Sequence, residues 1–443
     1  MIKNLFKHFC VNGSVLFALL SAQLCSAQAN PLLAKADQLA LEFEPKVIAW
    51  RRAIHQHPEL SNREFKTAAL VAAYLRSLGM EVKTGIAHTG VTGILKCGKT
   101  GPVIALRADM DALPITERND LSFRSTDSTM YNGKMTGVMH ACGHDSHVAM
   151  LLGAAGILTS MKKDLSGTIK FIFQPSEEGP PGGEEGGAKM MVKEGVLNDP
   201  PVDVIFGQHI SSGDKLGTFT YRPGSVSAEN DIFRITIHGK QTHGAAPWAG
   251  VDPIVTASQI VMALQTIISR NSALTTNAAV ITVGSFHAGN RENIIPEDAV
   301  LTGTIRTLDT GMRDVIQKRM HEVVSNIAAS AGATAETNIS MEDAMLVNDP
   351  ALTHEMAPTL NLLAINNGVT IVPAGMGAED FAYYAQRVPG FFFSTGALPP
   401  GKKPSEVMHH TPDLLLDESS FKTGVRALCY LTINYMDKHA VKK

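Results

Sequence analysis

The feature that most constrains this chain is a polar stretch that runs directly into an apolar one. The polar stretch is Met139-His140-Ala141-Cys142-Gly143-His144-Asp145-Ser146-His147, and the apolar residues 148–158 that follow predict a mostly buried helix. Cys142 and His144 would then lie at or just before a helix N-terminus, where unpaired N–H groups and the helix dipole favour a thiolate. A thiolate and an imidazole so close together suit a transition metal. The pair alone is a weak signal, because an inert thiol beside polar loop groups shows the same pattern.

The length and charge of the chain exclude several classes of protein. A chain of 443 residues is too long for one ordinary core, so we expect two domains or more. The formal net charge of −3 at pH 7 is close to balance. The sequence shows neither a basic pattern for nucleic acid nor an acidic tail. We therefore expect a small-molecule partner and no nucleic acid.

Residues 1–29 have the pattern of a signal peptide. Basic residues precede the apolar run 15–20, and Ala27-Gln28-Ala29 supplies small residues for cleavage. The run is too short to span a bilayer comfortably, so we expect export to the periplasm or the medium rather than a stable membrane anchor. Cleavage would leave too few cysteines for a disulfide framework, so that Cys142 stays free for other chemistry. The cysteines left are Cys97, Cys142 and Cys429.

Apolar runs predict strands of a buried sheet, and potential metal ligands follow most of them. The runs are residues 91–96, 103–106, 168–173, 202–207 and 390–394. The side chains that follow are Asp109 and Asp111, Glu177 and Glu178, His209, and His410. In an open α/β sheet, ligands bind outside the carboxyl ends of the strands, and the helix start at Cys142 faces the same edge. The sequence therefore predicts an α/β domain with a dinuclear metal site along this edge.

Between residues 227 and 340 the pattern changes to that of a separate module. Its predicted elements are strand 233–238, helix 254–268, strands 279–286 and 299–305, helix 312–329 and strand 334–340. That order, β-α-β-β-α-β, is the ferredoxin-like split arrangement. We therefore predict an inserted domain at 227–340, with 30–226 and 341–443 forming one discontinuous domain. Three polar residues of the insert lie in turns, namely His243, Asn293 and Arg306.

Six motifs point to a known family by their order and spacing. They are Arg107-Ala108-Asp109-Met110-Asp111-Ala112-Leu113-Pro114, His140-Ala141-Cys142-Gly143-His144-Asp145, Gln174-Pro175-Ser176-Glu177-Glu178-Gly179, Phe206-Gly207-Gln208-His209, Gly377-Ala378-Glu379-Asp380-Phe381 and His410-Thr411-Pro412. With them, the chain from about residue 35 to its end resembles the M20 family of metallopeptidases and amidohydrolases. The branch that it resembles most contains hippurate hydrolases, N-acyl-amino-acid amidohydrolases and auxin-conjugate amidohydrolases.

The resemblance implies a fold and an assembly. The fold would be a zinc-peptidase-like α/β catalytic domain, with a mixed sheet flanked by helices. The ferredoxin-like insert would be a lid that also serves for dimerisation, so a homodimer or a higher homo-oligomer is expected.

The resemblance also implies a set of metal ligands. Carried over by position, they are Cys142, His144, Glu178, His209 and His410, with Cys142 bridging two divalent ions. Thiolate, imidazole and carboxylate ligands together accept zinc, manganese, cobalt or nickel. Glu177 would be the general base, a task for a carboxylate that does not bind the ions. Glu177 and Glu178 can divide these roles because neighbours in an extended segment point in different directions.

Four further residues are expected to support the reaction. Asp111 would accept the second N–H of a ligand imidazole and thereby fix its tautomer. The resemblance places His243 at the oxyanion, often in the site of the partner subunit. It places Asn293 and Arg306 on the substrate carboxylate, which the guanidinium would bind in a bidentate manner.

Other polar residues have structural interpretations. His55 fits a helix-ending turn, and Glu379 and Asp380 are predicted to cap a helix. His409 is an alternative to His410 as a ligand, although the resemblance favours the histidine directly before the Thr-Pro pair. It is also an alternative hydrogen-bond donor.

The function that these features favour is that of an exported, metal-dependent amidohydrolase. It would cleave N-acyl amino acids of the hippurate kind to a carboxylic acid and a free amino acid. Dipeptidase or carboxypeptidase-like activity within the same family stays open. A metal-free cysteine hydrolase using Cys142 would resist chelators and would be inactivated by thiol reagents. A non-catalytic exported metal- or peptide-binding protein would have no need of the spare base Glu177.

Overall fold

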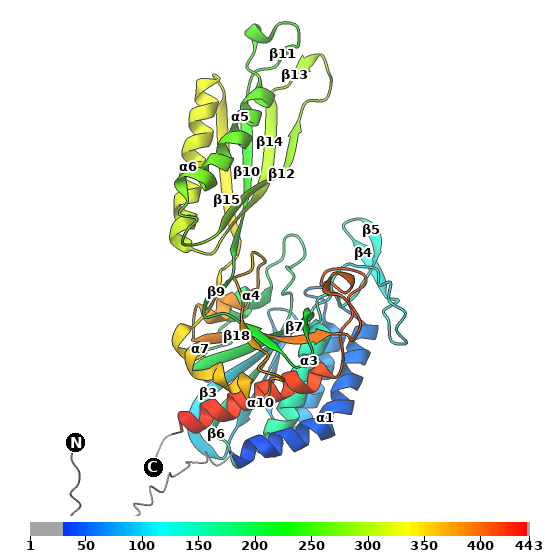
Figure 1. Ribbon diagram of the computed structural model, residues 1–443. Helices are drawn as coiled ribbons and strands as arrows, with labels where there is room; N and C mark the ends of the chain where they lie inside the picture. The colour runs from blue at the N-terminus through cyan, green and yellow to red at the C-terminus, as the bar shows by residue number, and fades with distance from the viewer. Residues whose placement is uncertain (1–29, 441–443) are drawn as a thin grey trace, which may run out of the picture.

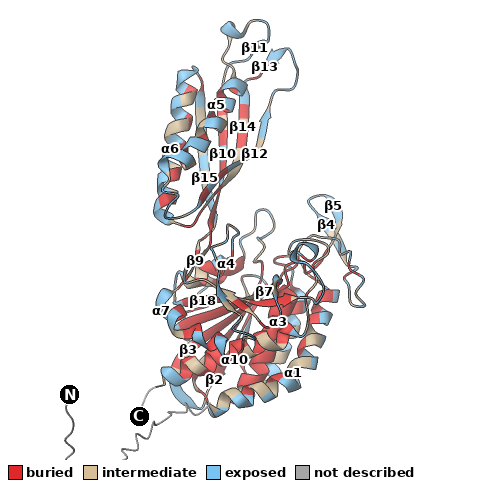
Figure 2. Ribbon diagram, in the orientation of Figure 1, coloured by how far each residue is buried: buried red, intermediate tan, exposed pale blue. Residues whose placement is uncertain are grey.

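The computed structural model describes residues 30–440, so the predicted signal peptide at 1–29 lies outside the described residues. Two main β-sheets, each with its own helices, form two units (Figure 1). Colouring by burial shows that each unit has its own interior (Figure 2). Within the described residues, no helix combines the length and the apolar character that a membrane span needs.

The larger sheet has eight strands, and its middle is parallel. Its order is β1 (Glu81–Ile86), β2 (Gly90–Lys96), β6 (Ser166–Gln174), β3 (Lys99–Asp109), β7 (Val204–Lys215), β18 (Gly390–Leu398), β8 (Phe219–Tyr221) and β17 (Val369–Ile371). β6, β3, β7 and β18 pair in parallel, whereas β2 and β8 run antiparallel beside this group. The predicted mixed sheet is confirmed, and the carboxyl ends of its four central strands meet at one edge.

One predicted strand end is wrong, because β7 does not stop at Gly207. It pairs with β3 up to that residue and then continues beside β18 as far as Lys215. Beyond the last residue that pairs with β3, β18 still offers backbone partners to β7, so the strand continues. As a result His209 lies inside the strand, opposite Ser394.

Helices cover both faces of the larger sheet. α1 (Pro31–Gln56), α3 (His144–Ser160) and α10 (Ser420–Lys438) pack together on one face, with α2 (Phe65–Ser77) beside them (Figure 1). α4 (Gly187–Lys193) and α9 (Ala382–Ala385) lie on the other. Side chains of a strand alternate between these cores: Ile104 and Leu106 face the first, and Ala105 faces the second. Every residue of α3 from His144 to Leu158 is buried, which confirms the predicted buried helix.

The smaller sheet has the predicted β-α-β-β-α-β order. Its elements are β10 (Glu229–His238), α5 (Pro253–Thr266), β12 (Ala279–Ala288), β14 (Asp298–Thr307), α6 (Thr310–Ser330) and β15 (Thr334–Asp343). All its strand pairs are antiparallel, in the order β12-β14-β10-β15. Phe233, Ile235 and Ile237 alternate along β10 and are buried in the core of this unit. The predicted domain limits at 226/227 and 340/341 stay predictions.

The smaller unit, which we call the lid, joins the larger one through a narrow connection. β9 (Gly224–Ser227) and β16 (Leu346–Asn348) pair antiparallel just outside it. At the opposite end of the lid, β11 (Thr242–His243) pairs with β13 (Ile294–Ile295) (Figure 1). The remaining elements are β4 (Ser128–Tyr131), β5 (Lys134–Gly137), η1 (Pro247–Ala249), η2 (Ile267–Asn271), α7 (Pro350–Met356), α8 (Pro358–Asn361) and η3 (Pro404–Glu406).

Candidate metal centre

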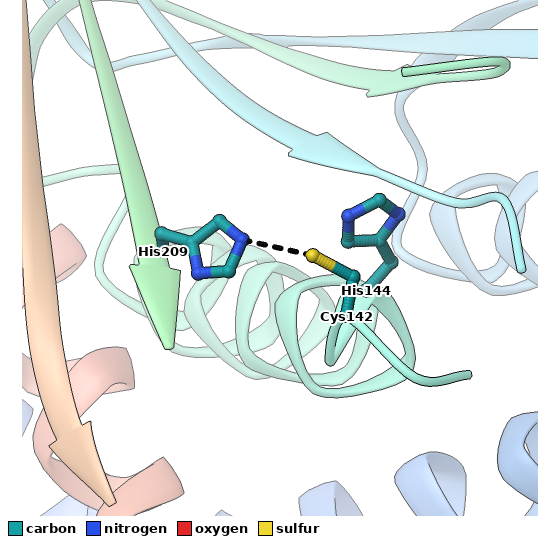
Figure 3. Close-up of side chains that lie close together, drawn as sticks. All are labelled: Cys142, His144 and His209. Atoms are coloured by element: carbon teal, nitrogen blue, oxygen red, sulfur yellow. Dashed lines mark hydrogen bonds between the residues drawn. The ribbon is translucent and has the colours of Figure 1, made fainter. Parts of the chain in front are cut away.

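A buried thiol is the centre of the candidate site. Cys142 lies just before α3, and its Sγ is 3.3 Å from His209 Nε2 (Figure 3) and 3.3 Å from His410 Nε2. His209 comes from β7, whereas His410 comes from the loop before α10. The structure therefore brings together side chains from three distant parts of the chain.

Two sets of potential ligands share this thiol. Cys142, His144 and His209 offer ligand atoms within 4.8 Å of one another, and so do Cys142, Glu178 and His410. His410 Nε2 is also 3.1 Å from Glu178 Oε1. All five predicted ligands thus lie in one cluster.

Backbone carbonyl groups orient two of the imidazoles. His144 Nδ1 is 2.9 Å from the carbonyl oxygen of Asp111, and His209 Nδ1 is 2.6 Å from that of Ile210. When Nδ1–H donates to a carbonyl, Nε2 carries the free lone pair, which is the form that binds a metal. In His144 this Nε2 is buried and has no hydrogen-bond partner.

Asp111 supports the site in more ways than the sequence predicts. Its Oδ1 is 3.3 Å from His144 Nδ1, so the predicted contact with an imidazole is shared with its own backbone carbonyl. Its carboxylate also accepts the backbone N–H groups of Glu177 and Glu178, both at 3.0 Å, and the hydroxyl of Ser61 at 2.7 Å. One residue therefore holds both the imidazole and the acidic segment.

These contacts control the charge of Asp111 and the shape of the acidic segment. Burial alone would raise the pKa of the Asp111 carboxyl, but its hydrogen bonds to His144 and to Ser61 outweigh burial and lower it. Ser176, directly before the two glutamates, has a φ of 57°, an uncommon conformation for a residue other than glycine. The Asp111 carboxylate thus fixes a strained turn at the end of β6.

Glu177 lies next to the ligand cluster but faces other carboxyl groups as well. Its Oε2 is 3.8 Å from His144 Nε2, and it lies within 4.8 Å of Glu379 and Asp380. Burial, and after it the negative charges of Glu379, Glu178 and Asp380, hold the pKa of Glu177 well above its usual value. Such a carboxyl group has a strong tendency to take up a proton.

The prediction that Glu379 and Asp380 cap a helix is wrong for α9, which follows them, although Asp380 accepts the N–H of Ala188 in the first turn of α4 at 2.7 Å. α9 has no side-chain cap, and these carboxylates bind the fully buried guanidinium of Arg107 at 3.1 and 2.8 Å. Arg107 also donates to Asp109 at 2.7 Å and to Gln174 at 2.8 Å. A buried cation needs such partners, and here it balances the carboxylates behind Glu177.

Sequence reasoning missed this role of Arg107. The available signal was an arginine at the end of an apolar run that predicts a strand buried on both faces. Such a position requires buried acidic partners.

Two histidines near the cluster have both ring nitrogens engaged. His147 is 2.6 Å from Asp109 through Nδ1, and its Nε2 accepts the backbone N–H of Ile210 at 2.8 Å. His409 Nδ1 is 3.1 Å from the carbonyl of Cys142, and its Nε2 accepts the N–H of Ser212 at 3.1 Å. His409 is therefore a hydrogen-bonding partner of the segment that carries Cys142, and the geometry favours His410 as the ligand.

His55 lies at the end of α1, as predicted, and has a structural role there, but it is buried rather than part of an exposed turn. It is buried, with Nδ1 2.7 Å from Asp145 and Nε2 3.2 Å from Glu117. Arg51 reaches the same oxygen of Asp145 at 2.9 Å. This ion cluster connects α1 to the first turn of α3, directly beside the ligand His144.

The donor set fits a pair of divalent cations. His144 Nε2 is buried without a hydrogen-bond partner, and Glu178 Oε1 is buried with the His410 imidazole as a polar neighbour at 3.1 Å; both atoms belong to the cluster around Cys142. Leaving buried polar atoms unpaired is costly unless something binds them. Sulfur, nitrogen and oxygen donors at these positions are what a transition-metal site requires.

The structure does not bring the three predicted lid residues into this cluster. His243 is exposed at the far end of the lid, where the N–H of Gly244 donates to the carbonyl of Asn293 at 2.9 Å. Arg306 lies at the other end of β14 and donates to the carbonyl of Met376 at 2.8 Å. A strand of this length separates Asn293 from Arg306 by roughly 30 Å.

This fold and this site define the class of the protein. The chain belongs to the peptidase family M20/M25/M40, whose model matches residues 105–434. The protein is thus a metal-dependent hydrolase of amide or peptide bonds, and the predicted family and its amidohydrolase branch are confirmed.

Individual relatives cover most of the chain. Thermostable carboxypeptidase 2 of Saccharolobus solfataricus is 42% identical over 92% of this chain and 100% of that one. IAA-amino acid hydrolase ILR1-like 4 of Arabidopsis thaliana is 34% identical over 89% of this chain and 87% of that one. The solved structure of the Bacillus subtilis YxeP protein, a dinuclear metal binding peptidase from the M20 family, has a TM-score of 0.75 at 33% identity, covering 90% of this chain and 100% of that one.

Proposed function

We propose that the protein is an exported, dinuclear amidohydrolase that cleaves N-acyl amino acids to a carboxylic acid and a free amino acid. One observation carries the proposal: two ligand sets share the sulfur of Cys142, and the spare carboxyl group of Glu177 lies beside them. A pure binding site has no use for that carboxyl group. A metal-free cysteine hydrolase has no use for a second ligand set around the same sulfur.

The five clustered side chains would hold two cations. Cys142, His144 and His209 would bind one, and Cys142, Glu178 and His410 the other. Zinc, manganese, cobalt and nickel all accept such mixed donors. Bound there, the cations would polarise an amide carbonyl and lower the pKa of water.

Glu177 moves the protons in this proposal. Its carboxylate accepts the proton of the attacking water and delivers it to the leaving nitrogen, which departs as an amine. Glu177 suits this task because it stands in neither of the two ligand sets that contain Cys142. The raised pKa of its carboxyl group favours proton uptake, and the Arg107 cluster holds the carboxylates behind it.

We assign recognition of the substrate to two chains together. Arg306, at the base of the lid, would bind the substrate carboxylate together with Asn293 of the partner subunit. The partner's His243 would donate a hydrogen bond to the oxyanion. This arrangement explains why Asn293 and Arg306 of one chain lie at opposite ends of β14.

Two surface features of the lid support a homodimer. α5 exposes Ile254, Val255 and Met262, with 37%, 54% and 72% of their surfaces accessible. β12 is an edge strand of the lid sheet. An apolar helix face beside an open sheet edge is typical of a surface that is covered on assembly.

The names of the relatives support hydrolysis of amide bonds to amino acids. One relative is an IAA-amino acid hydrolase, whose name describes an amino acid conjugate. A second candidate function, carboxypeptidase activity, is favoured by the name of the relative from Saccharolobus solfataricus. Export rests on the signal-peptide pattern of residues 1–29.

The test is a chelation and metal add-back assay on N-benzoyl and N-acetyl amino acids and on dipeptides. We expect a chelator to abolish activity, one of the four metals to restore it, and N-acyl amino acids to be cleaved faster than dipeptides. Full activity in chelator would remove the metal from the mechanism. Faster cleavage of dipeptides would favour the carboxypeptidase-like alternative.

A further inference from the structure

The far end of the lid is exposed but has few of the charged side chains that are typical of a surface in contact with solvent. The ten residues 241–250 include no charged side chain, yet most of them are exposed. Trp248 is 83% exposed, the largest value for any large apolar side chain of the described residues. A bare tryptophan is typical of a surface that is buried against a ligand or a partner. We call residues 241–250 and 293–295 the lid tip.

Hydrogen bonds give the lid tip a defined shape. On one side of the segment that carries His243, Gly244 N–H donates to the carbonyl of Asn293 at 2.9 Å. On the other side, Lys240 and Val251 exchange two backbone hydrogen bonds of 2.9 and 3.0 Å. Trp248 lies in the segment that returns along this second side, in the short helix η1. Asn293 thus lies on one side of the segment that carries His243, and the chain that carries Trp248 returns on the other.

The strand register places a second apolar residue next to His243. His243 of β11 is directly opposite Ile294 of β13. Residues directly opposite in an antiparallel pair project on the same face of the ribbon. Ile294 is 41% exposed, so an apolar side chain accompanies the exposed imidazole.

We propose that Trp248, together with Ile294, forms an apolar wall for the acyl group of the substrate. The inference rests on the proposed function, in which the lid tip enters the site of the partner subunit. There, His243 would stand at the carbonyl oxygen and Asn293 at the carboxylate, on the amino acid side of the bond. The segment that carries Trp248 returns on the other side of His243 from Asn293, which would be the acyl side.

The chemistry of the lid tip defines the class of acyl group. An indole ring binds aromatic and bulky apolar groups through its face. The absence of charged side chains from residues 241–250 leaves no partner there for an acidic acyl group. The enzyme should therefore prefer benzoyl-like or other bulky apolar acyl groups over acetyl.

The experiment compares N-benzoylalanine with N-acetylalanine in the full-length enzyme and its variants. In Trp248→Ala, kcat/KM for the benzoyl substrate should fall about tenfold more than for the acetyl substrate. Trp248→Phe keeps an aromatic face and should stay within about threefold of the unmodified enzyme. Val315→Ala is the matched control, because it removes a 44% exposed apolar side chain from α6 of the same unit.

Each outcome separates this inference from the proposed function. If Trp248→Ala changes both substrates equally, the residue does not select the acyl group, and the inference fails. If His243→Ala leaves both activities intact, the lid tip does not enter a site, and the proposed arrangement of two chains fails as well. If His243→Ala abolishes both activities while Trp248→Ala leaves the benzoyl-to-acetyl ratio unchanged, only the inference is lost.

Discussion

The metal centre and the lid tip both present histidines for chemistry, but they hold them in opposite ways. His144 is fully buried, its Nδ1 contacts a backbone carbonyl, and its Nε2 faces a thiol and three carboxylates. His243 is exposed, and its Nδ1 accepts the N–H of Ala245, two residues further on, at 3.0 Å. The predicted ligands around His144 all come from one chain. His243, by contrast, is held by its own turn and faces solvent.

The difference shows how such an enzyme divides its tasks. The groups that bind cations and move protons need fixed geometry, so the fold surrounds them with buried hydrogen bonds. In the proposed mechanism, the groups that contact the substrate need access, and the lid tip that would carry them is exposed at the end of a separate unit. A change at the metal centre should therefore act within one chain, whereas a change at the lid tip should act on the partner subunit.

Of the changes at the candidate metal centre, Glu177→Gln is expected to have the largest effect on activity. The variant keeps the shape of the site but removes the base, so kcat should fall by about a thousandfold or more while metal content is unchanged. Steady-state kinetics measures the fall in kcat, and elemental analysis measures the metal content. Glu184→Gln, which alters an ion-paired carboxylate of the adjacent loop, is the control and should keep full activity. Retention of most activity in Glu177→Gln would exclude this residue as the base.

His243→Ala tests the other side of the comparison. Loss of an oxyanion donor should lower kcat by about a hundredfold or more without loss of metal. Mixing this variant with Glu177→Gln before reassembly should then restore activity to about a quarter of the unmodified level, because about half the dimers are mixed and each contains one intact site. Absence of any recovery in verified mixed dimers would show that His243 acts within its own chain.

A smaller effect is expected when the support of the metal centre is weakened. In Asp111→Asn one amide N–H of the Glu177–Glu178 segment loses its acceptor, since an amide side chain offers a single oxygen. Affinity for the metal should fall about 10- to 100-fold, measured by competition with a chelator. The same loss in Ser61→Ala, which keeps the carboxylate, would assign the effect to the hydroxyl contact instead.

The smallest effect concerns the ion cluster behind the metal centre. Burial and Arg51 oppose the charge of His55, but Asp145 and Glu117 outweigh them and raise its pKa above the ordinary value of 6.5. The folded protein thus binds this proton more tightly than the unfolded chain. The stabilisation is complete below about pH 6 and is lost as the pH rises through the raised value.

Urea unfolding of His55→Gln relative to the unmodified protein measures this contribution. The loss of unfolding free energy should be about 1–3 kcal/mol at about pH 6 and should shrink in alkali. His57→Gln, at a histidine with a 58% exposed side chain, is the control. A loss that grows with pH would contradict the assignment of a charged His55.

Much of the fold was predictable, because its signals are local. The buried strand β3 and the buried helix after His144 could be predicted from uninterrupted apolar runs in the sequence. The six elements of the lid are likewise separated by clear turns. The extension of β7 past Gly207 was not predictable, since it depends on β18, a neighbour from the end of the chain.

In the candidate site, too, features with a local signal could be predicted, whereas contacts between distant segments could not. That the predicted ligands cluster could be anticipated, because the carboxyl ends of the central strands and the start of α3 meet at one edge of the sheet. The cluster around Arg107 could not, since its partner Asp380 is 273 positions away and no local pattern marks the contact. The dual role of Asp111 depends on the turn at Ser176, whose backbone conformation the sequence does not reveal.

Metal stoichiometry shows whether two bound cations share the thiol of Cys142. The unmodified protein should bind about two divalent ions per chain, and Cys142→Ala, lacking a ligand common to both sets, should lose both together. His409→Ala, in which a hydrogen-bonding neighbour is removed, should keep them. Two ions retained by Cys142→Ala, or the clean loss of only one, would contradict a shared thiolate.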